Sequence, residues 1–140
     1  MLSSKPILLV EDDGVDVMTV ERALKDLNVQ NQLVPAGDGE QALTYLRTRG
    51  APRPCVILLD LNMPKMNGTE FLKTVKADEA LRVIPVIVLT TSNTEQDITK
   101  SFELGAAGYM VKSIDYDKFI DTIRAIDLYW TQSKLPPNGD

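Results

Sequence analysis

Residues 55–60, Cys-Val-Ile-Leu-Leu-Asp, give the clearest strand signal in the sequence. Five uncharged, mostly apolar residues lead to a single carboxylate, and the run shows no alternation between apolar and polar positions. Such a run predicts a strand that is buried on both faces, as in parallel sheets covered by helices on each side. A second run of this kind, Pro-Ile-Leu-Leu-Val at residues 6–10, ends next to Glu11 and Asp12.

The rest of the chain alternates short apolar runs with amphipathic stretches. Further strands are predicted at residues 32–36, where Pro35 favours a sheet edge, and at residues 84–89 and 108–111. Helices are predicted after the N-cap Asp13, over 38–49, after the loop 62–68 in a stretch that carries Phe71, Leu72 and Val75, after Asn93 or Thr94, and after Asp115. Five strands alternating with five helices predict an α/β fold with a doubly wound parallel sheet.

Size and composition limit the functions of this chain. With 140 residues, of which 44% are hydrophobic, we expect one domain over residues 1–131, followed by a flexible tail over 132–140. The net charge of −5 argues against nucleic-acid binding, which requires clustered Lys and Arg. No apolar run is long enough to span a membrane and none resembles a signal peptide, so we expect a cytoplasmic protein.

Cysteine and histidine usage exclude further chemistries. The single cysteine, Cys55, rules out an internal disulfide, and its apolar neighbours indicate a small buried side chain rather than a reactive thiol. The chain has no histidine. This excludes histidine-based acid/base catalysis and histidine metal ligands, and it excludes a role as phosphohistidine donor.

Chemically active side chains stand where the predicted strands end. In open parallel sheets, ligands bind beyond the carboxyl ends of the strands, and the residues found there are Glu11, Asp12, Asp60, Thr90 and Lys112. Three neighbouring carboxylates repel one another unless a cation intervenes, and Mg²⁺ prefers such oxygen ligands. Asp60 is the candidate nucleophile, with Thr90 and Lys112 placed to clamp a phosphoryl group.

Each of these residues taken alone has a simpler explanation. Glu-Asp-Asp at residues 11–13 is also typical of a turn with a helix cap, a threonine at a strand end is uninformative, and a single lysine is usually solvated. Their joint placement at successive strand ends favours the phosphoryl site.

Four motifs in this order resemble the receiver domain of two-component response regulators: ILLVEDD at 7–13, LLDLNMPKMNG at 58–68, VIVLTTS at 86–92 and GYMVKS at 108–113. The resemblance covers about residues 5–130 and implies a flavodoxin-like fold with strand order 2-1-3-4-5. It implies that Asp60 is the phosphoacceptor and that Thr90 and Lys112 contact the phosphoryl group. It further implies that Mg²⁺ is held by Glu11, Asp12, Asp60 and the main-chain carbonyl of Asn62. Tyr109 matches the aromatic residue whose rotamer is coupled to the threonine hydroxyl.

The chain is most similar to single-domain regulators paired with phytochrome-type histidine kinases. This similarity rests on the LTTS and VED segments and on the last helix, which ends in Asp-Leu-Tyr-Trp at 127–130. It implies a sensor histidine kinase as partner. Such regulators often form homodimers through the fourth helix, fifth strand and fifth helix. Phe119, Tyr129 and Trp130 either serve that interface or extend the core.

Three positions depart from the usual receiver pattern. Ser113 stands where most receivers have a proline, so we expect either a trans bond after Lys112 or a strained loop, and the placement of Lys112 stays open. Glu11 replaces the more usual aspartate, and its extra methylene makes a water-mediated metal contact plausible. Thr91 is bulkier than the alanine or glycine common at its position, so we expect it to narrow access to Asp60.

Other functions remain open from the residues alone. A magnesium-dependent phosphatase would need a second carboxylate two residues after Asp60, where Asn62 stands. A flavin-binding module would need a phosphate-cradling loop in place of the acidic residues 11–13. A receiver that no longer accepts phosphate is a third alternative. A phosphorylation-controlled interaction module fits best: the sequence contains no DNA-binding or catalytic output segment, so the expected output is binding.

Overall fold

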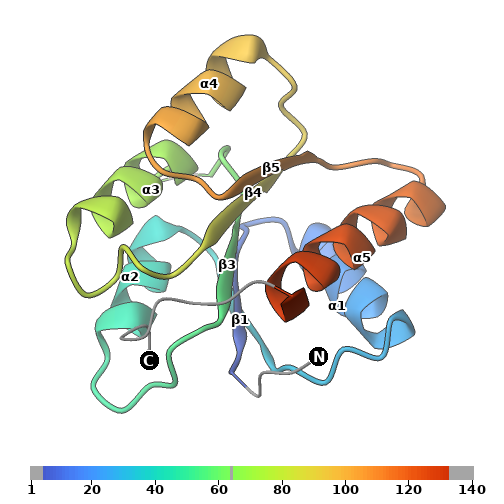
Figure 1. Cartoon of the computed structure of the whole chain (residues 1–140), viewed down its shortest axis with the longest axis horizontal. Helices are drawn as coiled ribbons and strands as arrows, with labels where there is room; N and C mark the ends of the chain where they lie inside the picture. The colour runs from blue at the N-terminus through green and yellow to red at the C-terminus, as the bar shows by residue number, and fades with distance from the viewer. Residues whose placement is uncertain (1–4, 64, 133–140) are drawn as a thin grey trace.

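The computed structural model describes residues 5–63 and 65–132, with side chains to residue 128. Strands and helices alternate along the described chain (Figure 1). The strands are β1 (Ile7–Val10), β2 (Leu33–Ala36), β3 (Val56–Leu59), β4 (Val86–Thr90) and β5 (Gly108–Val111). The helices are α1 (Gly14–Asp26), α2 (Gly39–Arg47), α3 (Gly68–Ala77), α4 (Glu95–Glu103) and α5 (Tyr116–Gln132).

All five strands pair in parallel, in the order β2-β1-β3-β4-β5. This confirms the predicted α/β class and strand order. β2 lies at an edge of the sheet and has one neighbouring strand, β1. Pro35, which has no N–H to donate, is tolerated at such an edge. The strand ends differ from the predicted ones by one or two residues. For β4, pairing begins after Pro85 and continues to Thr90.

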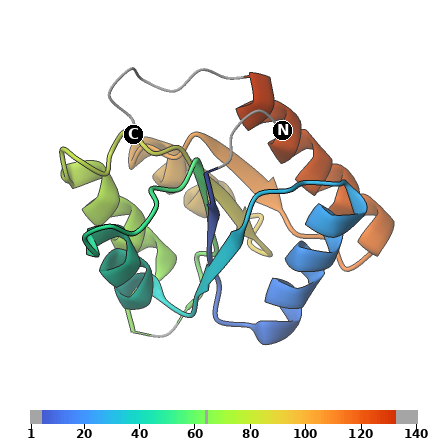
Figure 2. The same cartoon turned by 90° about the horizontal axis from the view of Figure 1, so that it is seen from below.

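Helices cover both faces of the sheet (Figure 2). Alternate residues of the central strands pack into two separate clusters, one on each face of the sheet, so these strands are apolar up to Thr90 at the end of β4. The first cluster packs α2 and α3 against Leu8, Val10, Ile57, Leu59, Val86 and Val88. The second packs α1 and α5 against Ile7, Leu9, Val56, Leu58, Ile87 and Leu89. We call them the α2–α3 core and the α1–α5 core.

Side-chain caps define where the helices begin. Asp13 caps α1 and Thr94 caps α4, as predicted, while Asn67 caps α3 in a capping box with Glu70. Each cap satisfies backbone N–H groups that the first helical turn leaves without a partner. The starts of α1, α3 and α4 are thereby fixed close to the carboxyl ends of the strands.

The predictions for single side chains have mixed outcomes. Cys55 is buried, with 2% of its surface exposed, and burial raises the pKa of its thiol to about 11. Phe119 is 3% exposed inside the α1–α5 core, so it extends the core and is not available to a dimer interface. The side chains of Tyr129 and Trp130, and the predicted tail beyond Gln132, lie outside the described part. Within that part, no helix is long and apolar enough to cross a membrane.

Candidate functional site

Strand register brings the predicted site residues to one rim of the sheet. Val10 is paired with Leu59, and the N–H of Asp60 donates to the carbonyl of Val10 over 3.0 Å. The next residues, Glu11 and Asp60, therefore leave neighbouring strands at the same level. On the other side, Thr90 is paired with Val111, and the N–H of Lys112 donates to the Thr90 carbonyl over 2.7 Å.

The three predicted acids converge at this rim. One carboxylate oxygen from each of Glu11, Asp12 and Asp60 lies within 4.8 Å of the others. Glu11 and Asp60 are 3% and 7% exposed, whereas Asp12 faces solvent. Two buried carboxylates and one exposed carboxylate fit a hard divalent cation that keeps some of its water ligands. The donor set therefore fits the metal that the sequence implies.

Lys112 lies beside the acidic cluster at the same rim of the sheet. Its ammonium forms an ion pair with Glu11, and it lies 2.9 Å from Oδ2 of Asp16 and 3.9 Å from Oδ2 of Asp60. Only 9% of its side chain is exposed. Burial by itself lowers the pKa of Lys112. The hydrogen bonds to Glu11 and Asp16, together with the negative charges of Asp60 and Glu11, outweigh burial, so the net shift of the pKa is upward. Lys112 is thus held charged beside Asp60.

Glu11 has both carboxylate oxygens engaged. Oε1 accepts the N–H of Asp13 over 3.2 Å, and Oε2 is the partner of Lys112. Burial raises the pKa of Glu11 from 4.5 to about 7, against the attraction of Lys112 and with a smaller contribution from the charge of Asp60. A metal that binds Glu11 therefore competes with a proton and with an ammonium group.

Thr90 and Tyr109 meet through Ser92. Thr90 is fully buried, and its Oγ accepts the N–H of Ser92 over 3.4 Å. The half-buried Tyr109 packs against the α2–α3 core, and its hydroxyl donates to the carbonyl of Ser92 over 2.9 Å. The two residues expected to form a switch are therefore linked by one backbone segment.

Two other expectations concern the loops of the rim. The bond between Lys112 and Ser113 is trans, as are all the peptide bonds of the described residues. Ser113 Oγ accepts the N–H of Asp115 over 3.1 Å, which shapes the turn leading into α5. Asn62 lies exposed two residues after Asp60. The role of its carbonyl in metal binding stays a prediction.

The roles of Asp16 and Gly68 were not predicted from the sequence. Asp16 lies in the first turn of α1, and its carboxylate contacts Lys112. No spacing in the sequence indicated this contact, because Asp16 and Lys112 are 96 positions apart. At Gly68, a Cβ atom would lie 2.3 Å from the carbonyl oxygen of Asp60 and 2.6 Å from Cα of Leu61. Only glycine allows α3 to start this close to Asp60.

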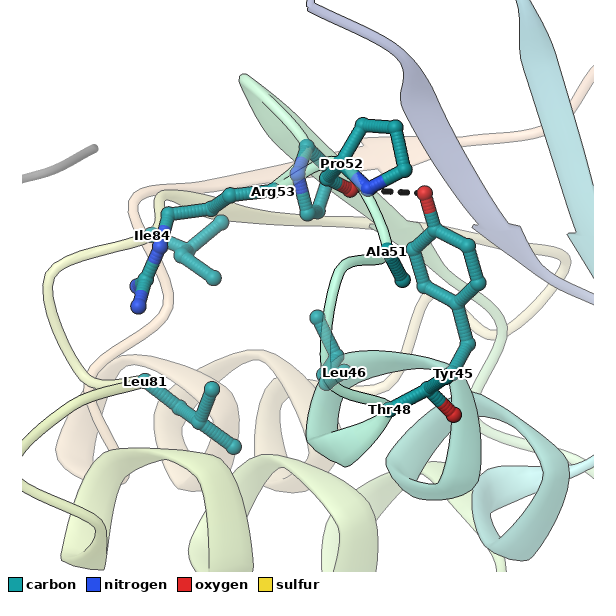
Figure 3. A pocket seen from close by; sticks show the side chains of 9 residues that line it. Tyr45, Leu46, Thr48, Ala51, Pro52, Arg53, Leu81 and Ile84 are labelled. Carbon is teal, nitrogen blue, oxygen red and sulfur yellow. Dashed lines mark hydrogen bonds between the residues drawn. The ribbon is translucent and has the colours of Figure 1, made fainter.

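A separate cavity of about 370 Å³ lies at the other end of the sheet (Figure 3). It is lined by Leu46, Leu81, Ile84 and the segment before β3, and the hydroxyl of Tyr45 donates to the Pro52 carbonyl over 2.6 Å. Ile84 and the 51–54 segment precede the strands. This cavity thus lies at their amino ends and contains none of the predicted site residues.

Comparisons with known proteins agree with this arrangement. The family model of the response regulator receiver domain matches residues 7–124. Response regulator Rcp1 of Synechocystis sp. is 38% identical over 137 residues, which cover 95% of this chain and 93% of Rcp1. Among solved structures, the phosphorylated cyanobacterial phytochrome response regulator RcpA is 38% identical with a TM-score of 0.88, covering 96% of this chain and 99% of RcpA.

A second solved structure bears on the acidic cluster. The Mn²⁺-bound form of Rcp1 is 39% identical with a TM-score of 0.85, covering 94% of this chain and 99% of that structure. Receiver domains bind a divalent metal at an acidic site, and Glu11, Asp12 and Asp60 form such a cluster here. The motifs, the strand order, the acidic cluster and the relatives all agree. This chain therefore belongs to the family of response regulator receiver domains, which act as phosphoacceptor switches.

Proposed function

We propose that Asp60 accepts a phosphoryl group from a sensor histidine kinase in a Mg²⁺-dependent reaction, and that this switches a protein-interaction surface. The observation that carries the proposal is the position of Asp60. Its carboxylate belongs to the acidic cluster with Glu11 and Asp12, and Oδ2 lies 3.9 Å from the ammonium of Lys112. A nucleophilic carboxylate between a cation site and a lysine suits phosphoryl transfer.

The chemistry is a displacement at phosphorus. An oxygen of Asp60 forms a bond to the phosphorus atom while the bond to the donor imidazole nitrogen breaks, and that nitrogen keeps the electron pair. Lys112 and the hydroxyl of Thr90 are the residues that would hold the phosphoryl oxygens. A Mg²⁺ ion held by Glu11, Asp12, Asp60 and the carbonyl of Asn62 would neutralise charge on the transferred group. Hydrolysis of the acyl phosphate restores the carboxylate, so the protein catalyses only its own phosphorylation and dephosphorylation.

A phosphohistidine donor would lie outside this chain, which contains no histidine. The relative RcpA supports a phytochrome-type kinase, since RcpA is a phytochrome response regulator. The surface beside Asp60 suits a protein partner. Val15, Met18 and Ile114 are 70%, 68% and 107% exposed, and Val15 and Ile114 line a cavity of about 360 Å³ that includes Lys112. We place this exchange in the cytoplasm.

A homodimer through α4, β5 and α5 is the second part of the partner proposal. Each of these elements carries one exposed large apolar side chain: Phe102 on α4, Val111 on β5 and Leu128 on α5. Exposed apolar side chains on these three elements favour association. Light scattering of the protein with and without a phosphoryl analogue tests this, and Phe102→Glu is expected to lower the dimer fraction.

A phosphatase of related chemistry is less favoured, because Asn62 cannot transfer protons. The decisive test is incubation with a small phosphodonor and Mg²⁺, followed by intact mass measurement. The wild type is expected to gain one phosphoryl group, and Asp60→Asn or metal-free protein none. Asp78→Asn is a matched control, since Asp78 accepts backbone N–H groups at the far end of α3. A wild type that stays unmodified with every donor would indicate a receiver that no longer accepts phosphate.

A further inference from the structure

Asp16 stands outside the acidic cluster but shares its lysine. The carboxylate lies in the first turn of α1, is 37% exposed, and has Oδ2 at 2.9 Å from Nζ of Lys112. The helix start is fixed by Asp13, whose Oδ1 accepts the N–H groups of Val15 and Asp16. Asp16 is therefore presented to Lys112 by a capped helix rather than by a loop.

The ion pair between Lys112 and Glu11 conflicts with metal binding. Glu11 is one of the three acids that fit a divalent cation, and both of its oxygens are engaged. An ammonium group on this carboxylate repels an incoming dication, so the ammonium must leave Glu11 when the metal binds.

The displaced ammonium needs another anionic partner. Lys112 is 9% exposed, so release into water would require it to leave a largely buried position. Of the three acids around it in the described structure, Glu11 and Asp60 belong to the acidic cluster and Asp16 does not. Asp16 already contacts Lys112 and can keep it charged and close to Asp60.

We infer that Asp16 is a positioning residue. It holds the ammonium of Lys112 when the carboxylate of Glu11 exchanges the lysine for the metal as its partner. The inference rests on the proposed function in that it requires the rim to bind a divalent cation. Beyond that function, the inference makes metal affinity depend on Asp16, a residue that lies outside the acidic cluster. It also supplies an anchor for Lys112 in a chain with Ser113, instead of proline, after the lysine.

A simpler role for Asp16 is a favourable charge at a helix N-terminus. That role and the proposed one predict different measurements. A helix-terminal charge affects the stability of α1 in the same way with or without Lys112. A partner of Lys112 affects metal affinity, and only when the lysine is present.

The test is calorimetric titration of the protein with Mg²⁺ and Mn²⁺. Asp16→Asn is expected to weaken binding by about threefold to fivefold, the range of a partly exposed ion pair. Asp13→Asn removes the same charge nearby but keeps the cap, so it is the control for general charge. Asp16→Glu retains a carboxylate and is expected to restore most of the affinity.

A double-mutant cycle completes the experiment. In a Lys112→Ala background, Asp16→Asn is expected to change affinity no more than Asp13→Asn does. Equal effects of Asp16→Asn and Asp13→Asn in the wild-type background would overturn the inference while leaving the proposed function intact. Failure of the wild type to bind either metal would overturn both. Thermal unfolding of each variant checks that the fold is retained.

Discussion

The side-chain hydroxyl of Ser92 donates a 2.5 Å hydrogen bond to Oδ2 of Asp97, which joins the segment after β4 to the first turn of α4. The backbone of Ser92 also contacts both expected switch residues: its N–H donates to Thr90 Oγ, and its carbonyl accepts from the Tyr109 hydroxyl. A movement of Thr90 toward a phosphoryl group would therefore act on Tyr109 and on α4 together.

Removing the Ser92 hydroxyl should disconnect α4 from the site. Ser92→Ala keeps the backbone contacts but leaves Asp97 without its partner, at an expected cost of about 1 kcal/mol in the free energy of unfolding. Hydrogen exchange at residues 95–98 should become faster. Glu95→Gln, which changes a charge in the same turn, is the control. Unchanged exchange in Ser92→Ala would show that the hydrogen bond does not hold α4.

Gly68 should not tolerate a side chain. An added Cβ would meet the backbone of Asp60 and Leu61 at 2.3 and 2.6 Å, and backbone atoms cannot move aside cheaply. Gly68→Ala is expected to destabilise the fold by about 1–3 kcal/mol and to slow phosphorylation, because Asp60 must shift. Gly14→Ala, at the start of α1, has open space and serves as the control. Equal denaturation midpoints for the two variants would contradict the close-approach argument.

Thr91 should limit access to Asp60. The residue is exposed and lines the cavity that also includes Asp16 and Lys112. Thr91→Ala is expected to speed both labelling by a small phosphodonor and hydrolysis of the acyl phosphate, by about threefold each, since water and donor enter more easily. Thr91→Val keeps the bulk without the hydroxyl and should behave like the wild type. If Thr91→Ala leaves both rates unchanged, the steric role is wrong.

The fold was predictable because the apolar strand segments and the amphipathic helical segments both indicate the same covered parallel sheet. Segments such as Ile7–Val10 and Val56–Leu59 are apolar on both faces, which only a covered parallel sheet accommodates. The predicted positions of the strand ends were less accurate, because a strand ends where its pairing with a neighbour ends. β4, for example, continues to Thr90 because Thr90 is paired with Val111. The rim residues were predictable for a related reason, since a parallel sheet directs all strand ends to one edge.

Other features of the site depend on packing that residue order does not express. Lys112 and Asp16 are 96 positions apart, and their contact requires the rotamer of a long side chain. The closeness of Gly68 to Asp60 depends on how α3 docks, not on the loop composition. Phe119 lies on an apolar helical stripe that suits a core and an interface equally, and only the tertiary structure assigns it to the core.

Glu11 should give the metal-free protein a characteristic pH dependence. Burial raises its pKa from 4.5 to about 7 in the folded state. Between these values the folded protein binds more protons than the unfolded chain, so this group lowers the free energy of unfolding as the pH rises. Relative to Glu11→Gln, the wild type should therefore lose stability from about pH 5 to about pH 7 and level off above. Thermal unfolding in a chelator across this range measures the difference. Glu103 is exposed, so the stability of Glu103→Gln should change with pH in the same way as that of the wild type. If the stability of Glu11→Gln also followed the wild type across this range, Glu11 would not titrate there.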